Sequence, residues 1–345
     1  AGQRASHRER RQHRGRRQAD HPPQRLAPRR RLEHREHSDV EGFVRAASDQ
    51  KWLELHGIEH WTEYYTDYGV ALQREFFDHF LKGEDNGWDR RPPVLLRVRT
   101  VDGGFVDRSE HEWPLARTRW SRWYLDADDL TLGDTPPAAG ARQAYEMLSS
   151  GLTFTSPAME GDVELTGPVA ARLFLSSSTS DADVFVTVRV FDPEGQEVLF
   201  QGAIDPKTPI AQGWLRASHR ALEPNLSTDI RPYHTHREIE PLTPGDLYQL
   251  DVEIWPTCLV VPAGHRIAVT VAGRDFDHGQ EGSRLAHFAN ELRGCGPFIH
   301  DDPRARPADV VEGQITLYTG GAHASYLMLP VIPPSGSESS APGSG

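Results

Sequence analysis

Between Val94 and Leu329 the sequence consists of short apolar segments separated by Gly, Pro and Asp. In Asp183–Phe191 the four valines occupy every second position and therefore share one face, as in a strand with one buried face. Many short strands with little helix between them predict a mainly β fold, a β-sandwich over residues 89–333. The expected strands are Val94–Arg99, Arg119–Leu125, Asp162–Leu165, Ala170–Leu175, Asp183–Phe191, Glu197–Gln201, Trp214–Ala217, Leu247–Ile254, His265–Val271, Gly313–Tyr318 and Ser325–Leu329. We expect Ala141–Leu148 to form a loop or a single helical turn.

Upstream of this region, Lys51–Lys82 predicts a strand, a turn and a helix. The run KWLEL has the length of a short buried strand, and the following HGIEHW carries His56 and His60. Thr66 can cap the helix, and Gly83 is its expected stop. A lone histidine in a turn is more often an ordinary polar residue than a catalytic base, so the residues alone leave both interpretations open.

Charge and composition exclude several classes of protein. The chain has 345 residues and a formal net charge of −12, which argues against nucleic acid as a partner. No apolar run approaches the roughly 20 residues of a membrane helix, so we expect no membrane partner and a cytoplasmic location. Two cysteines, Cys258 and Cys295, do not make a disulfide framework, although they could pair.

The first part of the chain has a different composition from the rest. Residues 1–37 contain 12 Arg and 4 acidic residues, with no Lys and no aromatic residue. Such a segment buries too little apolar surface to order itself, which predicts disorder over residues 1–39. A reading-frame artefact explains this composition better than a basic arm that binds an acidic surface. Residues 40–88 form a separate unit before the sandwich, and residues 334–345 read as a flexible tail.

Few motifs carry recognisable chemistry. The chain contains no G-x-S-x-G, Walker loop, G-x-G-x-x-G or H-E-x-x-H, so we predict no cofactor and can name no nucleophile. His234 and His236 form an H-x-H pair, but no third ligand completes a metal site, and a structural role is favoured. The acidic run with Asp275, Asp277 and His278 reads as a solvated loop, so we predict no metal.

Several segments in a fixed order resemble one family. They are KWLELHGIEHW, FFDHFLKGEDNGW, PPVLLRVR, EWPLARTRW, DVELTGPVAARLFLSSSTSDADVFVTVRVFDPEG, GWLRASHRALEP, RPYHTH, PLTPGDLYQLDVEIWPTCLVVPAGHRIAV and SYLMLPVIP. Over about Val40–Pro333 the chain resembles the cocaine esterase and X-Pro dipeptidyl-peptidase family of serine hydrolases, the CocE/NonD group. The resemblance implies a C-terminal jelly-roll, galactose-binding-like β-sandwich, preceded by the last strand and helix of a truncated α/β-hydrolase domain.

The resemblance also implies an activity. The family cleaves esters and amides, so a small acyl ester, amide or peptide substrate is expected. Its catalytic histidine follows the last hydrolase strand, which corresponds to His60 here, with His56 as the competitor. The nucleophile and the triad acid would lie upstream of Val40, so this chain resembles the C-terminal part of the enzyme and is expected to be inactive alone. We expect the single strand of residues 40–88 to have no sheet to join, and Phe76 and Phe80 to be exposed.

Two other classes of function remain open. A jelly-roll sandwich can bind carbohydrate, which would require exposed, coplanar Trp or Tyr side chains on one face. The sandwich could also be a structural domain that stabilises a homo-oligomer.

Overall fold

A computed structural model of the protein describes residues 35–57, 62–297 and 299–334. The helices and strands, in chain order, are α1 (Arg35–Arg45), β1 (Leu53–Leu55), α2 (Thr62–Tyr65), α3 (Asp67–Lys82), β2 (Val94–Arg99), β3 (Phe105–Glu110), β4 (Arg119–Asp126), β5 (Thr131–Gly133), β6 (Ala141–Glu146), β7 (Leu152–Thr155), β8 (Val163–Ser177), β9 (Asp183–Phe191), β10 (Glu197–Val198), β11 (Ala211–Arg216), β12 (Tyr248–Val261), β13 (Arg266–Ala272), α4 (Ala308–Val311), β14 (Gln314–Thr319) and β15 (Tyr326–Ile332). The chain is therefore mainly β, as the alternating segments predict.

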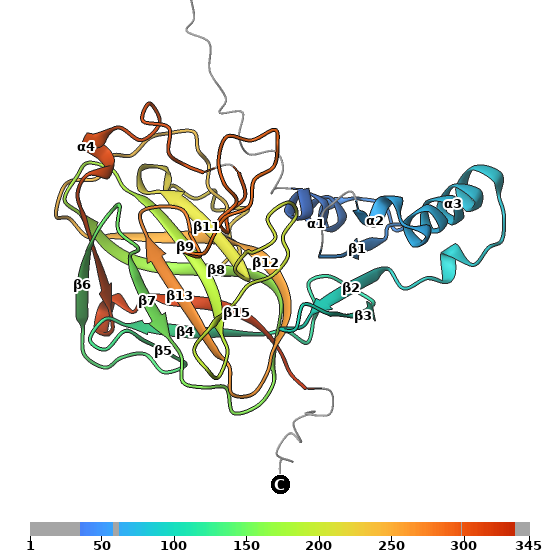
Figure 1. Cartoon of the computed structure of the whole chain (residues 1–345), viewed down its shortest axis with the longest axis horizontal. Helices are drawn as coiled ribbons and strands as arrows, with labels where there is room; N and C mark the ends of the chain where they lie inside the picture. Colours follow the sequence, from blue (N-terminus) through green and yellow to red (C-terminus); the bar gives the residue numbers. More distant parts are fainter. Residues whose placement is uncertain (1–34, 58–61, 298, 335–345) are drawn as a thin grey trace, which may run out of the picture.

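The body of the molecule is a sandwich of two β-layers. One layer runs β11–β9–β13–β7, and the other runs β12–β8–β15–β4, with β14 pairing both β8 and β6. The short β5 pairs β4 on one side and β7 on the other, so it links the two layers. Figure 1 shows this body beside a smaller arm that carries α1, β1, α2 and α3.

The alternating pattern of β9 places its valines in the core between the layers. Val184, Val186 and Val190 have no exposed surface, and they pack in one cluster with Leu173 of β8 and Val252 of β12. Burial of such side chains is the main favourable term in forming the sandwich. The strand follows the predicted bounds because its apolar period matches a pleated, half-buried surface.

The longest pairing in the sandwich is between β8 and β12. The two expected strands Asp162–Leu165 and Ala170–Leu175 are one continuous strand, because β12 pairs along its whole length. The register shifts between Ile254 and Thr257, where Pro256 cannot donate a ladder hydrogen bond. Trp255–Cys258, at this irregularity, face the arm across a cleft.

The arm is joined to the sandwich, which corrects our expectation that its strand has no sheet to join. β1 pairs in parallel with β2, and Leu53 lies opposite Val94. Leu53 and Val94 share a second apolar cluster with Trp113 and Ile332. The expectation failed because a linker rich in charge and proline seemed to separate the two regions, whereas apolar side chains from both bury against each other.

Helix α3 begins and ends where the sequence indicates. The Oγ1 of Thr66 accepts a hydrogen bond from the backbone N–H of Gly69 at 3.1 Å, and Gly83 closes the helix at φ 73°. Phe76 and Phe80 are 36% and 39% exposed, as expected. The apolar stripe that contains them therefore stays partly in solvent in this chain.

Several elements differ from the predictions: β3, β5 and β7 were not expected, and the bounds of β10, β11 and β12 differ. Ala141–Glu146 is a strand, β6, rather than a loop or a helical turn, because it pairs with β14 and buries Tyr145. Disorder was expected up to residue 39, but α1 already begins at Arg35. The buried Val40 anchors this helix. Extending the helix toward its N-terminus costs little free energy, because each added residue gains one backbone hydrogen bond. Residues 1–34 and the tail 335–345 lie outside the described residues.

Candidate functional site

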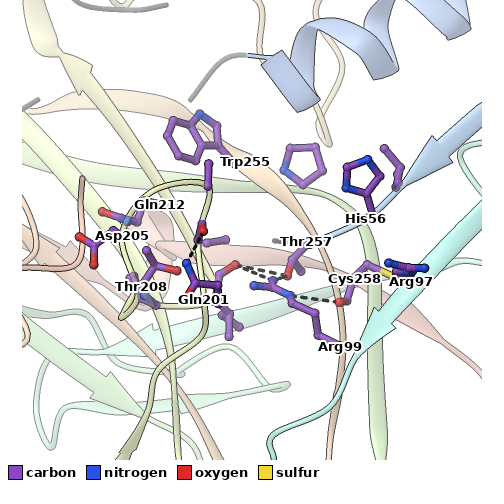
Figure 2. A pocket seen from close by; sticks show the side chains of 18 of the residues that line it. His56, Arg97, Arg99, Gln201, Asp205, Thr208, Gln212, Trp255, Thr257 and Cys258 are labelled. Carbon is purple, nitrogen blue, oxygen red and sulfur yellow. Dashed lines mark hydrogen bonds between the residues drawn. The ribbon is translucent and has the colours of Figure 1, made fainter. Parts of the chain in front are cut away.

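A cleft of about 200 Å³ lies between the arm and the sandwich. His56 and Gly57, which directly follow β1, form one wall. The opposite wall comes from the segment Gln201–Gln212 and from Trp255–Cys258 of β12. Figure 2 shows His56 on one side of the cleft, with Trp255 and Gln212 on the other. Segments that are far apart in the sequence therefore meet at one place.

Strand β2 supplies the positive charges of the cleft. Its Val94, Leu96 and Val98 are buried in the arm's apolar cluster, so alternation turns Arg97 and Arg99 toward the cleft. Arg97 forms ion pairs with Glu63 at 2.9 Å and with Asp107 at 3.0 Å. These two carboxylates balance the charge of Arg97.

Arg99 ties the cleft wall together. Its guanidinium donates to Thr257 Oγ1 at 2.7 Å, to the carbonyl oxygen of Ile210 at 3.1 Å and to that of Cys258 at 3.4 Å (Figure 2). It also stands over the ring of Phe200, 4.9 Å from the centroid. These contacts fix the guanidinium against the wall of the cleft.

Asp205 organises the far end of the cleft. Its side chain is 2% exposed, and it accepts backbone N–H groups from Lys207 at 3.0 Å, Gly294 at 2.8 Å and Gly296 at 3.1 Å. Three such bonds stabilise a buried carboxylate. They also hold the loop that carries Cys295 against the Gln201–Gln212 segment. Asp205 is thus a structural member of the wall.

Two other groups of the wall are buried without partners. In the described part of the chain, neither Nδ1 of His56 nor Nε1 of Trp113 has a hydrogen-bond partner. Native proteins pair the great majority of their buried polar groups, so these two atoms are exceptions in the wall of the cleft. The Cys258 thiol is also on this wall, and burial raises its pKa.

The histidine predicted as the catalytic base cannot be placed. His60 and the neighbouring Trp61 lie outside the described residues, whereas the competitor His56 lines the cleft. Gly57, the last described residue before that segment, also lines the cleft. The assignment of His60 therefore stays a prediction.

The aromatic residues near His60 take different positions. Tyr64 and Tyr65 are 55% and 75% exposed. The hydroxyl of Tyr68 donates to Glu54 at 2.9 Å. Burial and this hydrogen bond raise the pKa of Tyr68 to about 12. The Tyr68 hydroxyl therefore links α3 to β1 within the arm.

The H-x-H pair lies outside the cleft. His234 contacts the carbonyl oxygen of Asp251 at 2.8 Å, and burial lowers its pKa. His236 contacts His219 with 3.3 Å between their Nδ1 atoms. Over residues 35–57, 62–297 and 299–334, no group of three or more His, Cys, Asp or Glu side chains is arranged to hold a metal ion.

The sequence did not reveal one polar pair beside the cleft. Asp275 accepts from the His300 ring at 2.8 Å and from the His300 backbone N–H at 2.6 Å. These two residues are 25 positions apart, so spacing alone gave no signal. Asp277 bonds the N–H of Gly279 within its own loop, as expected for a solvated turn.

A family model matches residues 86–328, which is most of the described sandwich. Its description is the X-Pro dipeptidyl-peptidase C-terminal non-catalytic domain. The chain belongs to this family. It is the C-terminal part of a CocE/NonD-type protein, and the matched domain is the non-catalytic one.

Named relatives agree with this membership. The chain is 29% identical over 293 residues to a Mycobacterium bovis protein named as a serine esterase, a match that covers 75% of this chain and 40% of the relative. It is 23% identical over 301 residues to the cocaine esterase of a Rhodococcus strain, covering 76% and 46%. The chain thus spans less than half the length of these two relatives.

Solved structures also resemble the chain. A CocE/NonD family hydrolase from Staphylococcus aureus superimposes with a TM-score of 0.75 at 28% identity, covering 85% of this chain and 51% of that one. An α-amino acid ester hydrolase shares the fold with a TM-score of 0.53 at 17% identity. No helix among the described residues is long and apolar enough to cross a membrane.

Proposed function

We propose that this chain is the C-terminal part of a serine hydrolase that cleaves acyl ester or amide bonds, including those of peptides. The observation that carries the proposal is the cleft at the end of β1. Both residues described immediately after this strand, His56 and Gly57, line it. A histidine on a turn after a sheet strand is the position from which α/β-hydrolases present their catalytic base.

We propose His60 as that base. In the assembled enzyme a serine would attack the acyl carbon, and His60 would take the serine proton and return it to the leaving group. An aspartate would hold the imidazole in the correct tautomer. The printed sequence contains no G-x-S-x-G, so the serine and the aspartate would come from a hydrolase part outside this sequence. Residues Trp255–Cys258 of the sandwich would form one wall of the substrate site.

The proposal includes the finer fold assignments. A jelly-roll of the galactose-binding-like type is supported by two mainly antiparallel layers around one core. A remnant of an α/β-hydrolase domain in the arm is supported by the parallel pairing of β1 with β2, since parallel strands are typical of α/β domains.

An esterase assay on the purified chain tests whether the nucleophile lies outside this chain. We expect no hydrolysis of p-nitrophenyl butyrate above background, because the chain has no identifiable nucleophile. A fluorophosphonate probe, which labels activated serines, should leave the chain unlabelled. Turnover that disappears in His60→Ala but persists in His56→Ala would contradict this expectation and would show a nucleophile within the chain.

Reading the DNA upstream of the Val40 codon in all three frames tests the enzyme assignment itself. A G-x-S-x-G followed by an aspartate codon is the expected finding. If no frame contained such a motif, the carbohydrate-binding alternative would be favoured over the hydrolase assignment. That alternative needs an aromatic platform, and in the described part of the sandwich no tryptophan is exposed and Tyr233 is the exposed tyrosine.

A further inference from the structure

We propose that His219 and His236 form a binding site for a divalent metal ion that prefers nitrogen ligands, such as Zn²⁺. Neither residue lines the cleft between the arm and the sandwich. The site needs no hydrolase part and no substrate, so it is independent of the proposed function.

The first observation is the distance between the two rings. The Nδ1 atoms of His219 and His236 are 3.3 Å apart, and the ring centroids are 5.4 Å apart. Zinc–nitrogen bonds are about 2.0–2.1 Å long, and at the tetrahedral angle two such bonds place their nitrogen atoms about 3.3–3.4 Å apart. The two imidazoles therefore already have the spacing of two ligands of one zinc ion.

Without an ion, the contact is a hydrogen bond between two like groups. One Nδ1 carries the hydrogen and the other accepts it. The separation of 3.3 Å is longer than the roughly 2.7–3.2 Å of N–H···O bonds, so this contact is a weak one. An ion would use the lone pairs of both Nδ1 atoms, and each ring would then carry its hydrogen on Nε2. Coordination thus replaces one long hydrogen bond by two metal–nitrogen bonds.

The second observation is the backbone at His236. Its φ is 50°, and among the described residues only one other non-glycine residue has a positive φ. This conformation is uncommon for a residue with a side chain, and strained positions occur preferentially at functional sites. The preceding Thr235 donates its backbone N–H to the carbonyl oxygen of Ala221 at 2.9 Å. The chain around His236 is therefore held close to the segment that follows His219.

The third observation is that the pair is open to solvent. His236 is exposed and His219 is half-buried, so a hydrated ion can reach them. In the part of the chain that the structure describes, no third acidic, cysteine or histidine side chain completes a cluster, and water would fill the remaining positions. His234 is not a third ligand, because its Nε2 contacts the carbonyl oxygen of Asp251 at 2.8 Å and its Nδ1 is buried.

Two imidazoles with water in the other positions favour one group of metals. Imidazole nitrogen suits Zn²⁺, Ni²⁺ and Cu²⁺, whereas Mg²⁺ prefers oxygen ligands and keeps several waters. With two protein ligands the site would be weaker than a structural zinc site with four.

A bound ion would connect two segments of the sandwich. His219 ends the short 3₁₀ helix Ala217–His219 that follows β11, and His236 lies on the loop after it. The same loop contacts the arm, because Arg231 forms an ion pair with Glu41 of α1. Zinc would therefore stiffen the loop that holds α1 against the sandwich.

A zinc chloride titration of the intact chain with ¹³C-labelled histidine tests the site by NMR of the ring signals. Other histidines of the chain can bind zinc, so the signals of His219 and His236 are compared individually, each identified by its absence from the Gln variant. Both signals should move together and saturate at the same zinc concentration. In His219→Gln the His236 signal should need at least about ten-fold more zinc, because even the loss of an outer-shell partner costs a metal site about that much.

His278→Gln is the matched control. His278 lies on another loop, and its Nδ1 accepts a backbone N–H from Gln280 at 3.0 Å. Its removal should leave the zinc response of His219 and His236 unchanged. Magnesium chloride at the same concentrations should shift neither signal.

Three results would overturn the proposal: no response of either signal to zinc, saturation of the two signals at different zinc concentrations, or an unchanged His236 response in His219→Gln. If His219→Gln does not fold, His236→Gln, at an exposed loop position, serves for the same comparison on the His219 signal. The upstream DNA has no bearing on any of these results, so the metal site and the proposed function can fail separately.

Discussion

At the scale of single residues, the cleft depends on buried groups whose partners come from distant parts of the chain. Asp205 is the clearest case, because its oxygens join the Gln201–Gln212 segment to the backbone of Gly294 and Gly296. Gly294 has φ 114°, a backbone conformation that residues with a side chain rarely adopt. The wall of the cleft near Cys295 therefore depends on this one carboxylate.

Asp205→Ala should destabilise the protein by about 3 kcal/mol, because it leaves buried backbone N–H groups without an acceptor. Urea unfolding followed by tryptophan fluorescence measures this change. Asp102 provides the control, since it accepts from Thr100 and Gly104 on an exposed turn. Asp102→Ala should cost less than about 1 kcal/mol. Equal losses in the two variants would mean that burial does not set the strength of these contacts.

At the scale of secondary-structure elements, β12 and α3 show two different ways in which the sequence specifies structure. Trp255 and Thr257 line the cleft at the break in register around Pro256, and the register of β12 is set by pairing with the distant β8. Helix α3, in contrast, is specified locally by the Thr66 cap and the Gly83 stop. Because the ends of α3 are specified locally, a substitution at its N-terminal cap tests this account.

Thr66→Ala should weaken α3 by about 1 kcal/mol, because the N–H of Gly69 loses its acceptor. Hydrogen exchange should show amides of the first turn exchanging about five-fold faster, with the sandwich strands unchanged. Thr66→Ser retains the hydroxyl and should keep the protection of the wild type. If the serine variant exchanged as fast as the alanine variant, the lost methyl contacts, rather than the cap, would explain the effect.

At the scale of the whole molecule, a charge cluster ties the loop before α4 to the sandwich. Asp183 of β9 pairs with Arg216 of β11 and with Arg306, each at 2.8 Å, and it is 9% exposed. Burial raises the pKa of Asp183, but the hydrogen bonds and charges of Arg216 and Arg306 outweigh this and hold the pKa below its ordinary value of 3.8. The folded state thus favours the ionised form.

This cluster predicts a loss of stability in acid. A carboxyl group whose pKa is depressed by folding stabilises the protein above its unfolded pKa, and this contribution is lost as the pH falls through the folded pKa. The free energy of unfolding should therefore decrease from about pH 5 downwards. In Asp183→Asn this slope should be shallower, and the variant should be less stable than the wild type above about pH 5, where Arg216 and Arg306 lose an ionised partner.

Urea titrations at several pH values between 6 and 3 measure the slope, with Asp134→Asn as a control at an exposed loop position. The control should follow the wild type. An unchanged slope in Asp183→Asn would assign the acid sensitivity to other carboxyl groups.

The sequence alone determined the features that depend on local period and local caps. Alternating valines predicted β9 with its bounds, and Thr66 and Gly83 predicted the ends of α3, because pleat, cap and stop act over a few residues. The ordered segments from KWLEL to SYLML also predicted the family. These features follow from interactions between residues that are close in the chain, so one sequence is enough to find them.

Only the tertiary structure decided where the arm attaches and what faces the cleft. β1 joins β2, and β6 joins β14, although neither strand has a strong alternating pattern, because pairing partners supply the burial that short segments lack. His56, Trp113, Arg99 and Asp205 are far apart in sequence and meet because β2, β12 and the loops around them converge. Which polar groups are left without partners is a property of that convergence, and no pattern along the chain encodes it.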